Sequence, residues 1–386
     1  MKSRAYSRLE ILALAGLRML ADALPRRRRA PPATPRRILI AHHLLLGDTI
    51  MLTPLLAKCR ERWPAAEIVS TCPTAYAGLY SGHPYGVHAL AYDPYDVQTL
   101  RALRAESGFD LALVPGDNRL SWLARALDAR WIVAFAGDTP RYKDWPVDEL
   151  RTYPVTPMAW GDLVAGLIDG NAPAPYRVEC WPAPAADNFV PPVAPYCVLH
   201  AGASTPLKQW PADRWRELGT WLADRDLPVV LSAGRGEGLL LEEIDPERRW
   251  CRYDGTLSLG QLWHLVARAA LVVCPDTGVA HLARLTGTPT VALFGPGSAL
   301  LSGAGEFWRD SPFTALTVPD FPCRDQRITM KRDVAWIRRC ERAPGDAPNQ
   351  CPEARCMRAL STEMVRVAVG ARLGIAAARV QFSHRS

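Results

Sequence analysis

Short apolar runs alternate along the chain with stretches in which apolar residues recur at helical spacing. In the first half, the runs that predict buried strands lie at residues 37–42, 67–71 and 111–114. Between the first two runs, leucines at helical spacing predict a turn over residues 44–48 and a helix over residues 49–63. Because strand, helix and strand follow one another, we expect a parallel sheet with crossover helices.

The same alternation restarts after a proline-rich stretch between residues 180 and 195. So many prolines are incompatible with a helix or a central strand, and they therefore indicate a domain boundary. Beyond it, strands are predicted at residues 196–200, 228–232, 271–274 and 290–294. Helices are predicted at residues 212–225, 259–269 and 278–286, with a loop at residues 202–211. The sequence thus predicts an α/β protein with two similar halves and a cleft between them.

Five segments are predicted in this chain of 386 residues, which is long enough for two domains. They are an N-terminal extension (1–35), a first domain (36–185), a proline-rich linker (186–195), a second domain (196–360), and a C-terminal helix and tail (361–386). Ligands of open parallel sheets bind at the carboxyl ends of the strands. The loops that follow the predicted strands are therefore the places where functional residues are expected.

The net charge of +7 comes almost entirely from the N-terminal extension. Residues 1–37 carry ten basic and two acidic side chains, so the rest of the chain has a net charge of −1. A nearly neutral body argues against nucleic-acid binding. The content of 48% apolar and 22% charged residues also excludes a disordered or collagen-like chain.

The extension predicts an amphipathic helix followed by the four arginines of residues 26–29. Its charged side chains share one narrow sector, and they are Arg4, Arg8, Arg18 and Asp22. The opposite side carries Leu9, Leu12, Leu17, Met19, Leu20 and Leu24. This apolar stretch is too short to cross a membrane, and its flanks do not match a signal peptide. The pattern favours residues 1–30 lying on an anionic membrane surface over a helix packed on the body and followed by a solvated basic linker.

Ten cysteines in a chain without an export signal predict reduced thiols. Four of them lie late in the chain, at Cys323, Cys340, Cys351 and Cys356. Their spacing is irregular and contains no C-x-x-C pair. Free thiols in an irregular subdomain are therefore favoured over a structural zinc site.

The first candidate loop, Gly47-Asp48, follows the first predicted strand. Gly47 allows a tight turn, and Asp48 lies near the start of the predicted helix. An aspartate at this place is typical of a helix N-cap, and it is also a candidate general base toward a hydroxyl in the cleft. The residues alone leave both roles open.

Two further candidate loops lie in the second half. After its first strand, Gly202, Ser204 and Thr205 leave backbone N–H groups open, and Lys208 adds a positive charge. This combination suits a phosphate, although the Walker pattern is absent; the alternative is a solvated lysine in an ordinary loop. A glycine-rich turn follows the next strand, where Glu237 could accept hydrogen bonds from ribose hydroxyls or simply begin a helix.

The strongest candidate loop follows the third strand of the second half. Asp276 or Thr277 would cap the helix that begins at Gly278, whose free N–H groups can hold an anion. His281 lies one turn further along and could reach the same ligand. Together with Lys208 in the same half, these residues favour a diphosphate pocket.

These loops together resemble the ADP-heptose:lipopolysaccharide heptosyltransferase family, glycosyltransferase family 9. The family pattern G-D-x-x-x-x-x-P is matched at residues 47–54, and K-x-W-P is matched at residues 208–211. The most specific signature, D-T-G-x-x-H-x-A-x-x-x-G-x-P-x-x-x-x-F-G, is matched in full at residues 276–295. Because the motifs keep the family's order and spacing over about residues 36–300, the chain is identified as a member.

The resemblance implies a GT-B fold, in which the parallel sheets of two Rossmann-like domains face a central cleft. It implies inverting transfer of a sugar, heptose from ADP-heptose, to a lipopolysaccharide-type or other lipid-linked saccharide, without a metal or cofactor. Asp48 would be the general base, and Lys208 would stabilise the leaving diphosphate. The expected donor-binding residues are Gly202, Ser204, Thr205, Lys208, Glu237, Asp276, Thr277, Gly278 and His281. Gly47 and Arg119 are the expected acceptor contacts, although surface solvation explains Arg119 equally well; the enzyme would lie on the cytoplasmic face of the inner membrane.

Two features depart from the family pattern. His42-His43 precede the Gly47-Asp48 turn where many members have an arginine or serine, and Ser204-Thr205 replace the paired threonines of some heptosyltransferases. The histidines leave the identity of the acceptor open. A different donor sugar for another surface polysaccharide is an alternative, because the motifs do not define the sugar pocket. A binding or scaffold protein without catalysis is a second alternative, against which the presence of both Asp48 and Lys208 argues.

Overall fold

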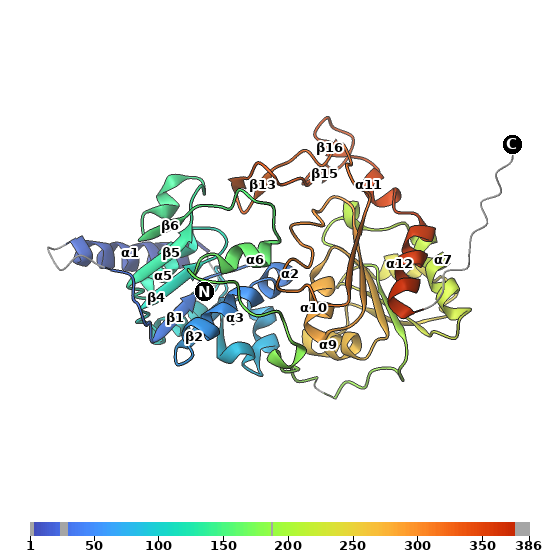
Figure 1. The fold of residues 1–386 in the computed structure, drawn as a ribbon, viewed down its shortest axis with the longest axis horizontal. Helices are drawn as coiled ribbons and strands as arrows, with labels where there is room; N and C mark the ends of the chain where they lie inside the picture. Colours follow the sequence, from blue (N-terminus) through green and yellow to red (C-terminus); the bar gives the residue numbers. More distant parts are fainter. Residues whose placement is uncertain (1–3, 24–29, 187, 375–386) are drawn as a thin grey trace.

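A computed structural model describes residues 4–23, 30–186 and 188–374, which form two α/β domains side by side (Figure 1). The first domain contains a parallel sheet of β1 (Arg37–Ile40), β2 (Glu67–Cys72), β3 (Val87–Ala91), β4 (Leu111–Val114), β5 (Trp131–Phe135) and β6 (Glu149–Arg151), in the order β3-β2-β1-β4-β5-β6. The second domain contains a parallel sheet of β7 (Cys197–His200), β8 (Val229–Ala233), β9 (Cys251–Asp254), β10 (Leu271–Pro275), β11 (Thr290–Phe294) and β12 (Phe313–Thr317), in the order β12-β11-β10-β7-β8-β9. Counted from its own first strand, each sheet has the same strand order. The predicted pair of similar parallel α/β halves is therefore confirmed.

Helices cover the faces of both sheets (Figure 1). Those of the first domain are α1 (Arg4–Ala23), α2 (Leu46–Ile50), α3 (Thr53–Arg62), α4 (Val97–Ala105), α5 (Leu120–Ala126) and α6 (Trp160–Ala165). Those that follow are α7 (Ala212–Ala223), α8 (Gly238–Ile244), α9 (Leu259–Ala267), α10 (Gly278–Thr286), α11 (Arg355–Arg358) and α12 (Thr362–Leu373). In α7, Trp215, Leu218 and Leu222 are fully buried, as their helical spacing predicts.

The helix predicted over residues 49–63 is wrong in its start and in its continuity. The chain forms two helices there, and the first of them already begins at Leu46, within the predicted turn. Pro54 lies in the first turn of α3, where its missing N–H costs nothing, but it could not continue a helix from α2. Because the chain breaks between α2 and α3, residues 45–48 lie at the start of the short helix α2, which contacts α10 of the second domain.

The two domains meet through closely packed backbone. A side chain at Gly47 would place its Cβ 2.8 Å from Cδ2 of His281, and one at Gly278 would place its Cβ 2.9 Å from the Leu46 side chain. The absence of a side chain at both positions therefore lets α2 and α10 approach each other this closely. Leu282 of α10 joins the apolar core of the first domain, so the interface continues below this contact.

A long irregular segment after β12, residues 320–342, crosses from the second domain to the first and back; we call it the strap (Figure 1). It contains one antiparallel pair of two-residue strands, β13 (Ile328–Thr329) and β14 (Arg332–Asp333). The strap begins on the second domain, where Arg324 donates to the carbonyl of Gly295 at 2.7 Å. Its middle lies on the first domain, where Val334 and Ile337 are buried in the core.

Helix α1 packs on the outside of the first domain against α4 and α5 (Figure 1). The predicted helix is confirmed for residues 4–23, whereas residues 24–30, with Leu24 and the arginines at 26–29, lie almost entirely outside the described residues. The buried side carries Ser7, Ile11 and Ala15. The exposed side carries Leu9, Leu12, Leu17 and Leu20, which are 46–71% exposed. The helix therefore contacts the body through Ile11, Ala15 and the partly buried Leu14, and it presents the other four leucines to the outside.

The charged sector of α1 contributes to this packing. Arg18 pairs with Asp128 at 3.2 Å, and Arg4 donates to the hydroxyl of Tyr95 at 3.2 Å. Within the described residues, no helix has the length and apolarity needed to span a bilayer.

Candidate active site

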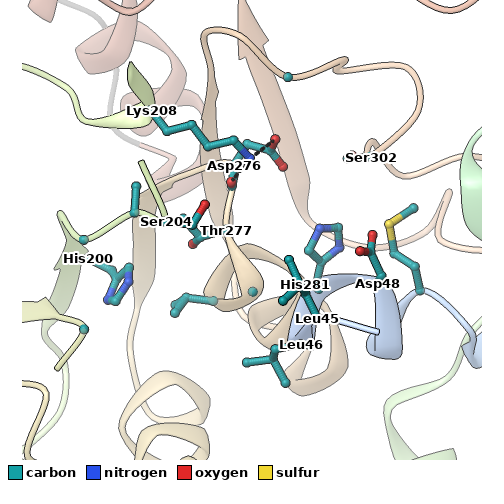
Figure 2. A pocket seen from close by; sticks show the side chains of 18 of the residues that line it. Leu45, Leu46, Asp48, His200, Ser204, Lys208, Asp276, Thr277, His281 and Ser302 are labelled. Atoms are coloured by element: carbon teal, nitrogen blue, oxygen red, sulfur yellow. Dashed lines mark hydrogen bonds and ion pairs between the residues drawn. The ribbon is translucent and has the colours of Figure 1, made fainter. Parts of the chain in front are cut away.

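A cavity of about 940 Å³ lies between the two domains, at the carboxyl ends of their strands (Figure 2). The loops after β1, β7, β8 and β10 all contribute to its wall. The predicted site residues that line it are Gly47, Asp48, Gly202, Ser204, Lys208, Glu237, Asp276, Thr277, Gly278 and His281. The fold thus brings together residues from four predicted loops.

Two predicted site residues do not line this cavity. Arg119 instead forms an ion pair with Asp117 at 2.6 Å, two residues before it in the same loop. Thr205 accepts a hydrogen bond from the backbone N–H of Leu207 at 3.4 Å and begins a short helical turn that ends at Lys208. Thr205 therefore shapes the loop that carries Lys208, and an acceptor contact by Arg119 stays a prediction.

Asp48 is half-buried within the first turn of α2. The N-cap of this helix is Leu45, and the Asp48 carboxylate makes no capping hydrogen bond, so the N-cap interpretation is wrong. Burial raises the pKa of Asp48 to about 6, and the nearby Asp276 carboxylate contributes in the same direction. The positive charges of Arg339 and Lys208 oppose this rise. A carboxylate with such a pKa is suited to accept a proton near neutral pH.

Lys208 is paired rather than solvated. Its Nζ donates to Oδ2 of Asp276 and to the backbone carbonyl of the same residue, both at 2.9 Å. The alternative of a lysine in open solvent is therefore wrong. The ion pair holds the Lys208 ammonium at the entrance to α10, where it adds to the positive end of the helix dipole.

The N-terminus of α10 has no side-chain cap from its own loop. Thr277 is the N-cap residue, as predicted, but its Oγ1 is buried without a hydrogen-bond partner and makes no capping hydrogen bond. Nδ1 of His281 is likewise buried without a partner. Buried polar atoms are nearly always satisfied, so these two atoms indicate a place for ligand groups. Figure 2 shows His281 next to Asp48 and directed into the same space.

His281 is uncharged in this environment. Burial lowers its pKa well below the usual value, and the cations of Arg284 and Lys208 lower it further. His200, which also lines the cavity, is neutral for the same reason, because burial lowers its pKa to about 4. Neither imidazole therefore supplies a fixed positive charge to the cavity.

Glu237 connects two of the loops. Its carboxylate accepts hydrogen bonds from the N–H of Gly234 at 2.6 Å and of Ala203 at 2.9 Å. A Cβ on Gly202 would overlap this carboxylate, which explains the glycine there. Glu237 directly precedes α8, so its position at a helix start is confirmed, while contact with a ribose stays a prediction.

Several lining residues have no counterpart in the sequence predictions. They are Tyr76 after β2, Trp160 of α6, Ser298 and Ser302 after β11, and Thr329, Met330, Arg339 and Glu341 of the strap. Nothing in the sequence pattern of the strap indicates that it crosses the cleft. The unusual His42, by contrast, is buried and contacts Oγ of Ser70 through Nε2 at 3.1 Å, away from the cavity.

The four late cysteines, Cys323, Cys340, Cys351 and Cys356, are free in this structure. Cys356 lies inside α11, and Cys351 belongs to β16 (Gln350–Cys351), which pairs with β15 (Ala343–Pro344). In the part of the chain that the structure describes, no three histidine, cysteine or acidic side chains are placed to hold a metal ion.

Known sequences with similarity to this chain are lipopolysaccharide heptosyltransferases. Lipopolysaccharide heptosyltransferase 1 of Pseudomonas aeruginosa is 26% identical over 323 residues, which cover 76% of this chain and 87% of that protein. Lipopolysaccharide heptosyltransferase 2 of Escherichia coli K12 is 33% identical over 99 residues, which cover 24% of this chain and 28% of that protein.

Solved structures show the same fold. ADP-heptose lipopolysaccharide heptosyltransferase II of E. coli matches with a TM-score of 0.64 at 18% identity, over 88% of this chain and 98% of that one. E. coli heptosyltransferase WaaC with ADP matches with a TM-score of 0.63 at 17% identity, over 87% and 99% of the two chains. The predicted GT-B architecture is thus confirmed.

The family profile of glycosyltransferase family 9 (heptosyltransferase) matches residues 98–306, which is more than half of the chain. That range includes the loops after β7, β8 and β10 and therefore most of the cavity wall. The chain belongs to glycosyltransferase family 9, the heptosyltransferase family of lipopolysaccharide biosynthesis, and it is a glycosyltransferase.

Proposed function

We propose that this enzyme transfers heptose, with inversion, from ADP-heptose to a lipopolysaccharide-type or other lipid-linked saccharide bound in the same cavity. The observation that carries the proposal is the placement of Asp48, from the first domain, opposite the Lys208–Asp276 pair and the uncapped start of α10. Structures of E. coli WaaC hold ADP and ADP-2-deoxy-2-fluoro heptose. The matching fold supports a donor of the same kind here.

The second domain would bind the nucleotide sugar. The free N–H groups of α10 and the Lys208 ammonium are positioned for the diphosphate, on which negative charge increases as the sugar leaves. Asp276 keeps Lys208 in place, while Thr277 and His281 offer unpaired polar atoms to the ligand. Gly202, Ser204 and Glu237 complete the wall on the nucleoside side.

The first domain would activate the acceptor. The Asp48 carboxylate takes the proton of the acceptor hydroxyl as the hydroxyl oxygen attacks the anomeric carbon. The bond between that carbon and the diphosphate oxygen breaks, and its electron pair leaves with the diphosphate. Attack from the side opposite the leaving group inverts the anomeric centre. Gly47 leaves room for the His281 ring beside Asp48, because a Cβ at this position would lie 2.8 Å from Cδ2 of His281.

The donor assignment is tested by calorimetry of ADP, UDP, GDP and dTDP without divalent metal. We expect wild type to prefer ADP, and Lys208→Ala to bind ADP about tenfold more weakly or worse, because a charged contact to phosphate is lost. Arg268→Ala, which removes an exposed cation of the same domain, is the matched control and should bind like wild type. Preference for another nucleotide would contradict the assignment of ADP-heptose as the donor. Absence of binding to all four nucleotides would contradict the proposed sugar transfer.

We also propose that α1 attaches the enzyme to an anionic membrane surface through its exposed leucines. Leu9, Leu17 and Leu20 are each at least 64% exposed on one side of the helix, an arrangement that a helix serving only to pack on the body does not need. The basic charge of the extension would add attraction to anionic lipid.

Sedimentation with liposomes tests this attachment. A Leu17→Ser, Leu20→Ser double variant should release the protein from vesicles that contain anionic lipid, while donor binding stays unchanged. Leu239→Ser changes a leucine that is 87% exposed on the second domain and serves as the control. Unchanged binding of the double variant would show that α1 is not the anchor.

A further inference from the structure

The exposed aromatic side chains of this protein gather on the first domain. In the part of the chain that the structure describes, the most exposed ones are Tyr6, Tyr95, Tyr142 and Trp145, which are 43–67% exposed. Tyr6 belongs to α1, and Tyr95 lies two residues before α4. Tyr142 belongs to the short 3₁₀ helix η3 (Arg141–Asp144), which Trp145 directly follows. No aromatic side chain among the described residues of the second domain is equally exposed, so the two domains offer different surfaces to a partner.

These segments cover one face of the first sheet, which we call the outer face. Its side chains pack with those of α1, α4 and α5 in one apolar cluster, whose members include Leu39, Val69, Ala112 and Ile132 from the strands and Ile11, Leu100 and Leu123 from the helices. Trp122 of α5 packs against the same cluster, and its indole donates to the carbonyl of Tyr142 at 3.1 Å, so η3 lies beside α5. The opposite face packs against α3, α6 and side chains of the second domain such as Leu282. The outer face is therefore the one directed away from the second domain (Figure 1).

Three aromatic rings form a cluster at η3. The ring of Trp145 lies 6.3 Å from that of Trp122 and 6.5 Å from that of Tyr142, measured between ring centres. Trp145 is nevertheless 67% exposed. The neighbouring rings hold its indole in place, while most of the indole surface stays available. Single exposed apolar side chains are common, whereas a cluster of them marks a surface that contacts a partner.

The chemistry of the outer face matches an anionic membrane surface. The exposed leucines of α1 suit the acyl region of a bilayer, and tryptophan and tyrosine rings favour the boundary between acyl chains and headgroups. Arginines are exposed on three of its segments, at Arg8, Arg101 and Arg141, and they add attraction to anionic headgroups. A two-fold dimer through this face would instead bring these arginines toward the like charges of the second copy, which favours lipid as the partner.

We propose that Tyr142 and Trp145 form a second membrane contact beside α1, in which both rings enter the headgroup region of an anionic bilayer. The inference rests on the proposed attachment through α1 in taking the membrane as the partner, but it concerns another element of the fold. One amphipathic helix leaves the enzyme free to roll about the helix axis, whereas two separated contacts fix one face against the bilayer. The first domain, with Asp48, is then held at the membrane, while the second domain stays clear of it.

Sedimentation of the full-length protein with phosphatidylcholine vesicles that contain phosphatidylglycerol tests this contact. A Tyr142→Ser, Trp145→Ser double variant, with α1 intact, should bind about tenfold more weakly or worse, because two aromatic side chains no longer leave water on binding. Trp145→Phe should retain part of the affinity. Leu239→Ser, Val367→Ser removes two exposed apolar side chains outside the first domain and is the matched control, which should bind like wild type. Thermal unfolding checks that each variant is folded.

A second measurement reports on the contact of Trp145 itself. Brominated phosphatidylcholine quenches tryptophan fluorescence over short distances, so wild type should be quenched on binding, and Trp145→Phe should lose part of that quenching. Trp250→Phe, which removes a half-buried tryptophan of the second domain, should retain it in full. This measurement needs only a conservative replacement of one exposed ring, and it therefore decides the question even if the double variant fails to fold.

The outcomes separate this inference from the attachment through α1. Unchanged vesicle binding by the Tyr142→Ser, Trp145→Ser variant, or equal quenching of wild type and Trp145→Phe, would overturn the inference. A change in the oligomeric state of the double variant without vesicles would assign the outer face to a second copy of the chain and would overturn it as well. Loss of binding in this variant but not in Leu17→Ser, Leu20→Ser would support the aromatic contact and refute the attachment through α1.

Discussion

The two domains have the same strand order but differ in what fills the crevice that this order creates. Such a crevice forms where neighbouring strands lead to opposite sides of the sheet, between β1 and β4 in the first domain and between β7 and β10 in the second. In the second domain, the loops after both strands line the cavity. In the first, the loop after β1 lines it, whereas the loop after β4 is covered by Arg332 of the strap. The shared topology thus creates one crevice in each domain. The crevice of the second domain is open to a ligand, whereas that of the first is filled by Arg332 of the strap.

The occupied crevice is a buried polar network. Nζ of Lys143 contacts Oδ1 of Asp138 at 2.6 Å, and the N–H of Asn118 donates to Oδ2 of the same carboxylate at 2.8 Å. Arg332 inserts beside them and satisfies Oδ1 of Asn118. Because these charges are paired and hydrogen-bonded, the crevice of the first domain has a structural role.

The largest loss of activity is expected on substitution of Asp48, because only the first domain supplies the general base in the proposed mechanism. Asp48→Asn should lower kcat by about 10²- to 10⁴-fold, since the amide cannot accept the proton. Its affinity for ADP, measured by calorimetry, should stay within twofold of wild type. A decrease in turnover of only a few-fold would remove Asp48 from the role of base.

Removal of Arg332 tests the occupied crevice directly. Arg332→Ala removes the buried donor of the Gly116 carbonyl and of Oδ1 of Asn118, and it should lower the free energy of unfolding by about 3–5 kcal/mol. Urea denaturation measures this change. Arg327→Ala, an exposed strap arginine paired with Asp333, is the control and should change stability by less than about 1 kcal/mol. Equal effects of the two variants would contradict a structural role for the crevice.

The close approach of the domains can be disturbed at Gly47. Gly47→Ala places a methyl group 2.8 Å from the His281 ring and should lower stability by about 1–3 kcal/mol as α2 and α10 separate. Thermal unfolding of this variant can be compared with that of Gly16→Ala, whose added Cβ meets no atom within 4 Å. Equal unfolding temperatures of the two variants would show that the His281 ring can move away from Gly47 at little cost.

The smallest expected effect is a shift in the pH dependence of activity, which Asp48 of the first domain determines. A base acts in its ionised form, so activity should be constant well above the Asp48 pKa of about 6 and fall about tenfold per pH unit below it. In Arg339→Gln this acidic limb should move to higher pH, because a positive charge that favours the carboxylate is removed. A profile of kcat/KM between pH 5 and 8 measures both, and an unchanged limb in the variant would contradict the electrostatic contribution of Arg339.

Elements with both a clear repeat and a clear end could be predicted from sequence. Helix α10 and strand β11 were predicted to the residue, at Gly278–Thr286 and Thr290–Phe294. Gly287 ends the helix in the left-handed conformation, with φ of 68°, as a glycine after a helical repeat indicates. Strand β9 was not predicted, since it lies at the edge of its sheet and lacks buried apolar residues.

Site residues could be predicted where a single loop contains a recognisable group of functional side chains. They could not be predicted where segments distant in sequence come together in the fold. Asp48, Lys208 and His281 lie in the cavity as predicted, because each follows a strand of a parallel sheet. The strap was missed because its strands are only two residues long and its main contact joins Arg332 to Gly116, 216 residues apart in sequence. Arg119 does not line the cavity, because its guanidinium forms an ion pair with Asp117 of the same loop.

The strap also limits how the cleft can open. Among the described residues, the polypeptide passes between the domains at the proline-rich linker and again in each direction through the strap, and Leu301 and Phe307, between β11 and β12, also pack in the core of the first domain. A single connection permits free rotation, whereas three separated ones permit little beyond bending about a common axis. Exchange of substrates between turnovers therefore requires either a small opening or release of the strap, with its Arg332 contacts, from the first domain.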